Sequence, residues 1–147
     1  YKNFDAQIFF QGAFNVDRMI VGNTRTSFIN FQSPDANQLD RWTEENRDAN
    51  ALYPRLRKEY NMNTGANSSF WVKDASYIKL KNVQLGYRFP DEITKRLTLQ
   101  GLRVFVTGTN LFTFAPKYLK GYDPEMDMNP SLYPSLRVIA FGLNVTF

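Results

Sequence analysis

The chain has 147 residues, enough for one ordinary domain or for a segment of a larger one. Hydrophobic residues make up 43% of it, so it is not a disordered, charge-dominated tail. It contains no cysteine and no histidine, which excludes a disulfide scaffold and a thiolate metal site and removes the commonest general base. Because these side chains are missing, we expect no enzymatic activity. The net charge of +4 comes from basic residues scattered among acidic ones, so we expect no nucleic-acid binding.

Alternating hydrophobic residues predict a first strand over residues 2–16. Phe4, Ile8 and Phe10 fall on one face of this strand, and mainly polar residues fall on the other. The chain starts at Tyr1, inside this pattern and without a methionine. We therefore expect it to be a piece of a longer protein.

Two long polar stretches follow strands of the predicted sheet. The first spans residues 17–70, is rich in turn residues and contains one expected short helix, over 37–45 with Trp42 on it. The second spans residues 115–136 and holds four of the chain's seven prolines. Loops of this length are uncommon in compact domains and usually have a function.

Two middle strands are predicted over residues 71–89 and 102–114. A short polar link over 90–101 joins them, beginning with proline and ending with glycine. In the first of these strands the hydrophobic residues occupy even positions at the start and odd positions toward the end. This change of phase predicts a β-bulge near Lys81–Asn82. The alternative is that the start of the strand is an end that faces the loop.

The final strand, over residues 137–147, has the strictest alternation. Its bulky hydrophobic face is formed by Ile139, Phe141, Leu143, Val145 and Phe147. From residue 139 onward the other face carries only small or polar side chains, those of Ala140, Gly142, Asn144 and Thr146. Such a strand fits the core of a soluble β-sandwich, or an outer-membrane barrel whose bulky face meets lipid and whose polar face lines the lumen.

The connections favour the barrel, because both long stretches fall at one end of the strands and the short link falls at the other. Outer-membrane barrels likewise have long external loops and short periplasmic turns. Each predicted strand also reaches the roughly 9–11 residues that a tilted strand needs to cross a bilayer. Aromatic residues collect toward both ends, as in the girdles of barrels: Phe112, Phe114 and Tyr118 near the loops, and Tyr87, Phe89 and Phe147 near the turn.

Four strands cannot close a barrel, since about eight is the minimum. On this interpretation the chain supplies only part of a larger barrel. The alternative is a secreted, soluble β-sandwich that binds carbohydrate. The two differ in a measurable way, because a sandwich buries Phe141, Leu143 and Val145 in its own core and a barrel exposes them.

Several segments match one known family in order along almost the whole chain. The clearest are DASYIKLKNVQLGY at 74–87, LRVFVTGTNLFT at 102–113, GYDPE at 121–125, Tyr133-Pro134 and FGLNVTF at 141–147. Looser ones are the strand residues 4–12, LDRWT at 39–43 and YPRL at 53–56. In these residues the chain resembles the C-terminal part of the SusC/RagA-like TonB-dependent transporters of Bacteroidetes outer membranes. One departure is Glu44, at a position where the family usually has proline.

The resemblance implies an all-β fold in which residues 1–147 form the last four antiparallel, up-and-down strands of a 22-stranded barrel. It also implies a plug domain and a TonB-contacting segment upstream of this chain. Members of the family import oligosaccharides, glycans or peptides across the outer membrane. A SusD-like lipoprotein covers the barrel from outside, and TonB couples import to the proton gradient of the inner membrane. We expect no cofactor.

Two groups of candidate site residues lie in the second half of the chain. The bulky residues Phe141, Leu143, Val145 and Phe147 resemble the C-terminal signal that the barrel-assembly machinery reads by strand pairing. The alternative is an ordinary last strand. A weak metal candidate is formed by the alternating oxygen ligands Asp123, Glu125, Asp127 and Asn129. This pattern lacks the glycine that turns a calcium loop, so we expect a solvated loop instead.

Aromatic residues in or near the first long loop form a further candidate site. They are Trp42, Tyr53, Tyr60 and Trp71. Exposed rings of this kind stack on sugars or press against a partner protein. The alternative is that the rings pack the loop onto itself.

Overall fold

The computed structural model describes residues 2–28, 33–58, 61–119, 121–128 and 132–147. It divides into two compact units. The sheet unit consists of residues 1–12, 78–114 and 135–147, and the loop unit consists of residues 13–77 and 115–134.

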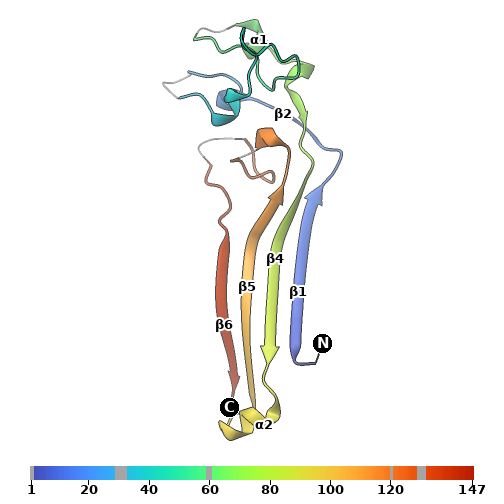
Figure 1. Cartoon of the computed structure of the whole chain (residues 1–147), viewed down its shortest axis with the longest axis vertical. Helices are drawn as coiled ribbons and strands as arrows, with labels where there is room; N and C mark the ends of the chain where they lie inside the picture. Colours follow the sequence, from blue (N-terminus) through green and yellow to red (C-terminus); the bar gives the residue numbers. More distant parts are fainter. Residues whose placement is uncertain (1, 29–32, 59–60, 120, 129–131) are drawn as a thin grey trace. The chain divides into compact units, whose positions relative to one another are not determined.

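The sheet unit is built on one four-stranded sheet with the order β1-β4-β5-β6 (Figure 1). The strands are β1 (Phe4–Ala13), β4 (Tyr77–Arg88), β5 (Gly101–Phe114) and β6 (Val138–Thr146). β5 pairs antiparallel with β4 and with β6. β1 and β6 are the two edge strands, so each has one neighbour in the described sheet. The antiparallel order agrees with the fold class that the sequence predicts.

The register of β4 and β5 shifts between Leu80 and Asn82, which confirms the predicted bulge. Leu80 pairs with Phe112 and Asn82 pairs with Thr109, so β5 supplies two residues where β4 supplies only one. The extra residue therefore lies on β5 and not on β4. Asn110, one of the two, has a φ of 53°. Asparagine tolerates this left-handed conformation better than most residues with a side chain.

The short link between β4 and β5, predicted only as a polar connection, contains a helix. This helix is α2 (Asp91–Arg96), which Pro90 precedes. Two acidic residues occupy its first turn and two basic residues its last turn, an arrangement that suits the helix dipole. These charges and the proline were the available sequence signal.

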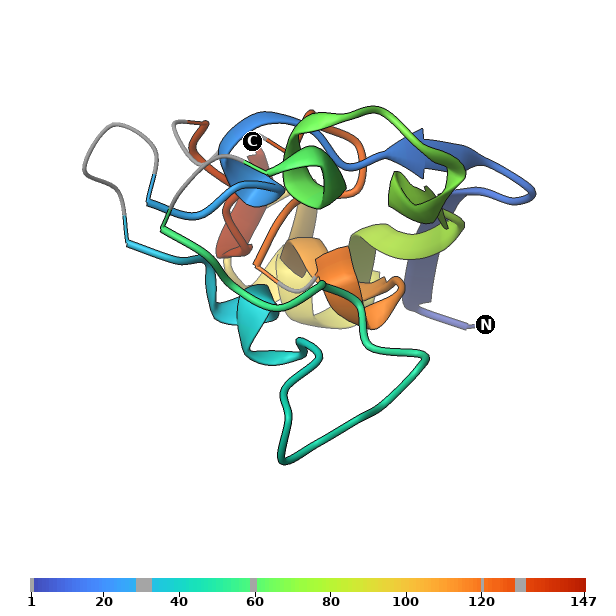
Figure 2. The same cartoon turned by 90° about the horizontal axis from the view of Figure 1, so that it is seen from above.

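The loop unit contains a two-stranded ribbon and several single helical turns. The ribbon pairs β2 (Asp17–Met19) with β3 (Val72–Asp74) in antiparallel fashion. The turns are η1 (Gly22–Thr24), η3 (Ala36–Leu39), α1 (Met62–Gly65), η4 (Ser69–Trp71) and η5 (Lys117–Leu119). In Figure 2 the teal segment that follows η3 runs out as a wide loop before the chain returns toward α1.

The helix predicted over residues 37–45 is only the single turn η3. Asp35 starts it with a capping box, because its side chain accepts from Asn37 N and its own N–H donates to Gln38. The turn ends at Asp40, whose ψ of 65° leaves the helical region. Beyond it the chain pairs with a distant segment, since Trp42 N donates to Tyr53 O at 2.9 Å. This pairing takes the place of further helical turns, so Trp42 is not on a helix.

Candidate functional site

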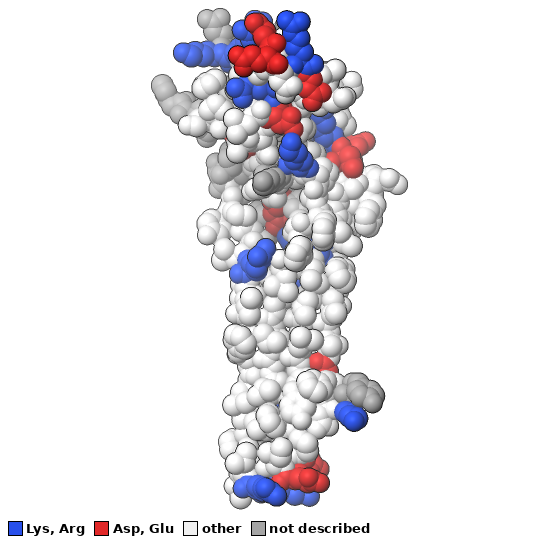
Figure 3. Space-filling view, viewed as in Figure 1, with Lys and Arg blue, Asp and Glu red and all other residues white. Residues whose placement is uncertain are grey.

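One face of the four-stranded sheet is apolar and exposed. The register aligns Leu85 with Val106 and Val106 with Phe141, and ring contact places Phe4 beside Tyr87. The large exposed residues of this face are Phe4, Ile8, Phe10, Leu85, Val104, Ile139, Phe141 and Leu143. Figure 3 shows few charged atoms along the strands and charged side chains at the α2 end of the sheet unit.

The exposure of β6 decides between the two architectures that the sequence left open. Phe141 is 85% exposed and Leu143 is 60% exposed, while Val145 is partly buried. Every buried hydrophobic residue of the described chain belongs to the loop unit. The described sheet unit thus has no hydrophobic core of its own, and the interpretation as a soluble sandwich is wrong. An exposed apolar face of this size is typical of a surface that lipid or another part of a protein covers.

The opposite face of the sheet is mainly polar. It carries Asp5, Gln7, Gln84, Arg88, Arg103, Thr107 and Asn144. Asp5 and Arg103 form a two-pronged ion pair, with Nε to Oδ1 at 2.9 Å and the second nitrogen to Oδ2 at 2.5 Å. Both faces follow from the two-residue period of a strand, which places apolar and polar side chains on opposite sides of one backbone.

Aromatic pairs lie near both ends of the sheet, in keeping with the predicted girdles. Tyr87 contacts Phe89 edge to face, with 5.1 Å between the ring centroids. Phe112 stacks on Phe114 at 5.6 Å. Tyr118 was predicted to join Phe112 and Phe114 in the girdle near the loops. It is instead only 3% exposed and belongs to the core of the loop unit.

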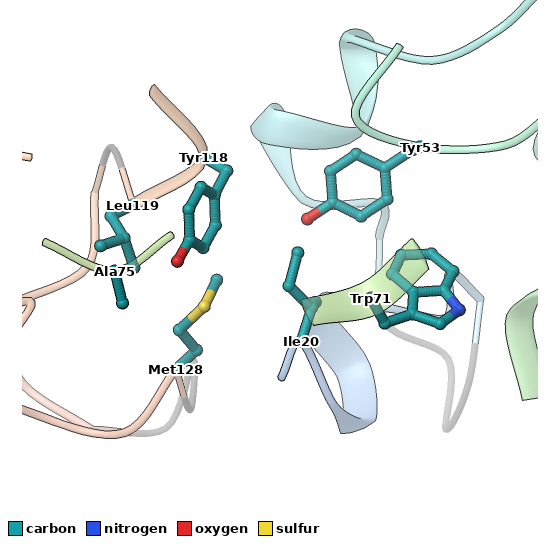
Figure 4. Packing of buried hydrophobic residues seen from close by; sticks show 7 residues of the cluster. All are labelled: Ile20, Tyr53, Trp71, Ala75, Tyr118, Leu119 and Met128. Carbon is teal, nitrogen blue, oxygen red and sulfur yellow. The ribbon is translucent and has the colours of Figure 1, made fainter. Parts of the chain in front are cut away.

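The two long stretches that the sequence separates fold together into the loop unit. The first stretch contributes Ile20 and Tyr53 to the core of this unit, and the residues just after this stretch contribute Trp71 and Ala75. The second stretch contributes Tyr118, Leu119 and Met128 (Figure 4). Polar contacts reinforce the union. The Arg18 guanidinium donates to the carbonyl oxygens of Met126 at 2.7 Å and Pro124 at 3.0 Å. Lys117 forms an ion pair with Asp40.

The predicted loop aromatics have different environments. Trp71 is fully buried, and its indole N–H donates to Asn63 O at 3.0 Å. Tyr53 is 2% exposed and packs against Trp71 with 5.9 Å between the rings. These two rings hold the loop together, which was the alternative role in the sequence analysis, and neither is open to a ligand. Tyr60 lies outside the described residues.

Trp42 is the predicted loop aromatic that remains partly open. It lines a surface cavity of about 350 Å³ together with Arg41, Glu44, Arg55 and Leu56. Arg55 and Glu44 form an exposed ion pair at 2.7 Å across this region. The cavity therefore combines an aromatic ring with charged hydrogen-bonding groups, the mixture that binding sites for polar ligands use.

The oxygen ligands predicted in the second stretch make hydrogen bonds within the chain. The Asp123 carboxylate accepts from Glu125 N at 3.1 Å, and Glu125 accepts from the Tyr77 hydroxyl. Asp127 is exposed, and Asn129 lies outside the described residues. Nowhere in the described ranges do three or more acidic side chains converge as a metal site.

A second cavity of about 310 Å³ adjoins this turn. Asp35, Tyr122, Asp127 and Tyr133 are among its lining residues. The Tyr122 hydroxyl donates to the Asp35 carboxylate, which also caps η3. Burial and this hydrogen bond raise the pKa of Tyr122, so the phenol stays protonated at neutral pH.

Phe147, the last residue of the predicted assembly signal, lies just beyond the end of β6 and is 83% exposed. Its ring is thus open to contact from another molecule. Among the described residues, no helix has the length and apolar character needed to cross a membrane.

Comparison with known proteins supports the membrane interpretation. No family model matches the chain. Two TonB-dependent receptors of Formosa agariphila align with all of it: P3 at 29% identity over 162 residues and P26 at 33% over 165 residues. The chain is homologous to the TonB-dependent receptors. It spans only 15% and 16% of the length of these two relatives.

Solved structures agree with this relationship at the level of the fold. The RagAB peptide importer in its open-open state matches the whole chain with a TM-score of 0.69 at 23% sequence identity. The closed-closed state gives a TM-score of 0.70 at 22% identity. In both cases the chain covers 16% of the matched protein. The sheet is therefore a segment of a receptor barrel, as the resemblance to the SusC/RagA-like family predicted, whereas the count of 22 strands stays a prediction.

Proposed function

We propose that this chain is the final part of the wall, with two external loops, of a TonB-dependent nutrient importer in the outer membrane. The observation that carries the proposal is the exposed apolar face, on which Phe141 is 85% exposed. Lipid chains would cover that face, and neighbouring strands of the same receptor would pair with β1 and β6. Unpaired strand edges are not tolerated in hydrocarbon, which supports a closed parent barrel.

The imported material in this proposal is an oligosaccharide, another glycan or a peptide. A SusD-like lipoprotein would cover the loop unit, and TonB would act through a part of the receptor outside this chain. The RagAB peptide importer gives one example of a related fold with peptide as cargo. Within this chain, the Trp42 cavity, with its ring and its charged neighbours, is the proposed contact for cargo or lipoprotein.

Growth and uptake experiments on the full-length receptor test the proposed transport. A deletion strain should lose growth on one class of glycan or peptide as sole nutrient, and the intact gene should restore it. Trp42→Ala should lower uptake of that nutrient or capture of the lipoprotein while leaving the amount of receptor in the membrane unchanged. Leu39→Ala, a substitution of an exposed loop residue outside the cavity, is the matched control. Unimpaired growth of the deletion strain on every such nutrient would contradict the importer.

Phe147 and the bulky residues Val145, Leu143 and Phe141 before it are the proposed signal for the barrel-assembly machinery. A free aromatic end on an alternating strand suits capture by strand pairing. Deleting Phe147 from the full-length receptor should lower its yield in the outer membrane. The comparison is deletion of Phe28, an exposed aromatic residue of the loop unit. An unchanged yield after loss of Phe147 would remove the proposal.

A further inference from the structure

A continuous row of residues crosses the polar face of the sheet from β1 to β6. It consists of Asp5, Gly86, Arg103, Phe105 and Gly142, here named the Arg103 ladder. Arg103 of β5 reaches across β4 to Asp5 of β1 and forms the two-pronged ion pair. A guanidinium and a carboxylate joined in this way hold each other in one orientation, unlike a single-point contact.

Gly86 makes this reach possible. A Cβ at position 86 would lie 2.5 Å from the Arg103 guanidinium and 2.6 Å from the Asp5 carboxylate. Any larger residue there would displace one partner of the ion pair. The strand neighbours on the same face are Gln84 and Arg88, so a single place along this part of β4 leaves room for the pair.

The other half of the ladder repeats this relation with an aromatic ring. Phe105 is in register with Gly86 on one side and with Gly142 on the other. Its ring covers Gly142 at the position that a Cβ would occupy. The Arg103 guanidinium lies over the same ring, 4.9 Å from its centroid. The ladder thus joins all four strands through three side chains, those of Asp5, Arg103 and Phe105, and two glycines.

The alternation of hydrophobic residues does not by itself determine the register of the strands. A slip of one residue turns the apolar face toward water, but a slip of two residues keeps every side chain on its own face. In this sheet a slip of two would put the Phe105 ring over Ala140 or Asn144 in place of Gly142. It would also put Gln84 or Arg88 beneath the Arg103 side chain.

We propose that the Arg103 ladder sets the register of these four strands against slips of two residues. Asp5, Arg103 and Phe105 act as positioning residues, and Gly86 and Gly142 are the glycines of the described strands β4 and β6 over which their side chains fit. The proposal concerns assembly of the sheet and is independent of what the receptor transports.

Disulfide trapping in the full-length receptor reads the register directly, because this chain contributes no cysteine of its own. Phe4→Cys with Tyr87→Cys reports the native register of β1 and β4, whose rings lie 4.7 Å apart. Ala6→Cys with Tyr87→Cys reports the slip of two. On the background of Asp5→Arg, which places two cations across Gly86, the native cross-link should fall by about threefold or more and the slipped one should rise.

A second variant, in which the two charges are exchanged, distinguishes loss of the ion pair from a general failure of Asp5→Arg to assemble. Asp5→Arg with Arg103→Asp restores opposite charges and should return both the assembled receptor and the native cross-link. Recovery by the swap supports the ladder. An unchanged cross-link pattern in Asp5→Arg, or no recovery in the swap, overturns it.

The glycines provide an independent arm with a matched control. Gly142→Val should weaken the native β5–β6 cross-link, Val104→Cys with Leu143→Cys, and strengthen the slipped one, Val104→Cys with Val145→Cys. Gly101→Ala is the control, because a Cβ there meets Thr146 only at ordinary contact distances of 3.6–3.7 Å. Equal cross-linking in the two glycine variants would contradict a register role for the Phe105 ring.

Discussion

Two tyrosine hydroxyls in the loop unit differ in whether they have a partner. The Tyr122 hydroxyl donates to Asp35, whereas the buried Tyr53 hydroxyl has no hydrogen-bond partner among the described residues. Removing a hydroxyl that lacks a partner loses no bond, but removing one bonded to a carboxylate costs about 1.5–3 kcal/mol. Tyr53→Phe should therefore leave local stability unchanged or raise it, and Tyr122→Phe should lower it. Amide hydrogen exchange of residues 40–53 in the full-length receptor measures both, and equal effects would contradict this account.

The same residues make the loop unit sensitive to alkaline pH. Burial is the main cause that raises the pKa of Tyr53, Tyr118 and Tyr122 above the ordinary phenol value. A raised pKa in the folded state contributes stability below the ordinary value of about 10, and this contribution is lost as the pH rises through the folded values. Amide exchange of the loop unit should therefore speed up above about pH 10 by more than the intrinsic base-catalysed rate. Tyr122→Phe should reduce the excess, and an excess that stays the same in this variant would argue against the phenols.

At the scale of single elements, the bulge in β5 depends on one backbone conformation. Asn110 has a positive φ, and its amide also donates to Leu136 O at 3.1 Å. A β-branched residue at such a φ costs about 1–2 kcal/mol, while glycine avoids the steric conflict. Asn110→Val should lower the temperature at which the folded receptor loses its heat-modifiable gel mobility, and Asn110→Gly should lower it less. Thr109→Val, at the neighbouring position without a positive φ, is the control, and similar losses at both positions would contradict the role of the bulge.

The elements also differ in how far local sequence specified them. The irregular pairing near Lys81–Asn82 was predictable, because a change of phase in β4 is visible in the order of hydrophobic residues. The strand that carries the extra residue, β5, was not predicted. The helix over 37–45 was not, because the chain after Asp40 pairs with Tyr53 and local propensity carries no information on that pairing. For α2 the local sequence does carry a signal, in Pro90 before the helix and in the acidic and basic residues of its first and last turns.

At the scale of the whole molecule, the two faces of the sheet should respond oppositely to charge. Phe141→Arg places a cation on the apolar face of β6, which costs about 2–4 kcal/mol near the middle of a bilayer. Ala140→Arg places the same cation one residue away on the exposed polar face. The first variant should reduce insertion of the full-length receptor into the outer membrane, as measured in fractionated membranes, and the second should insert nearly normally. Equal insertion of both variants would show that lipid does not cover the apolar face.

The sequence by itself determined which side chains share a face of each strand, because that pattern repeats every two residues and is local. It also indicated the fold class, through strand length and the contrast between long and short connections. Only the tertiary structure decided which of the loop aromatics are buried and which are exposed. Tyr53 and Trp71 are buried because the second long stretch contributes Tyr118, Leu119 and Met128 to the same core. The burial of these two rings depends on residues more than 40 positions away in the chain. A local sequence pattern carries no information on which distant residues will pack together.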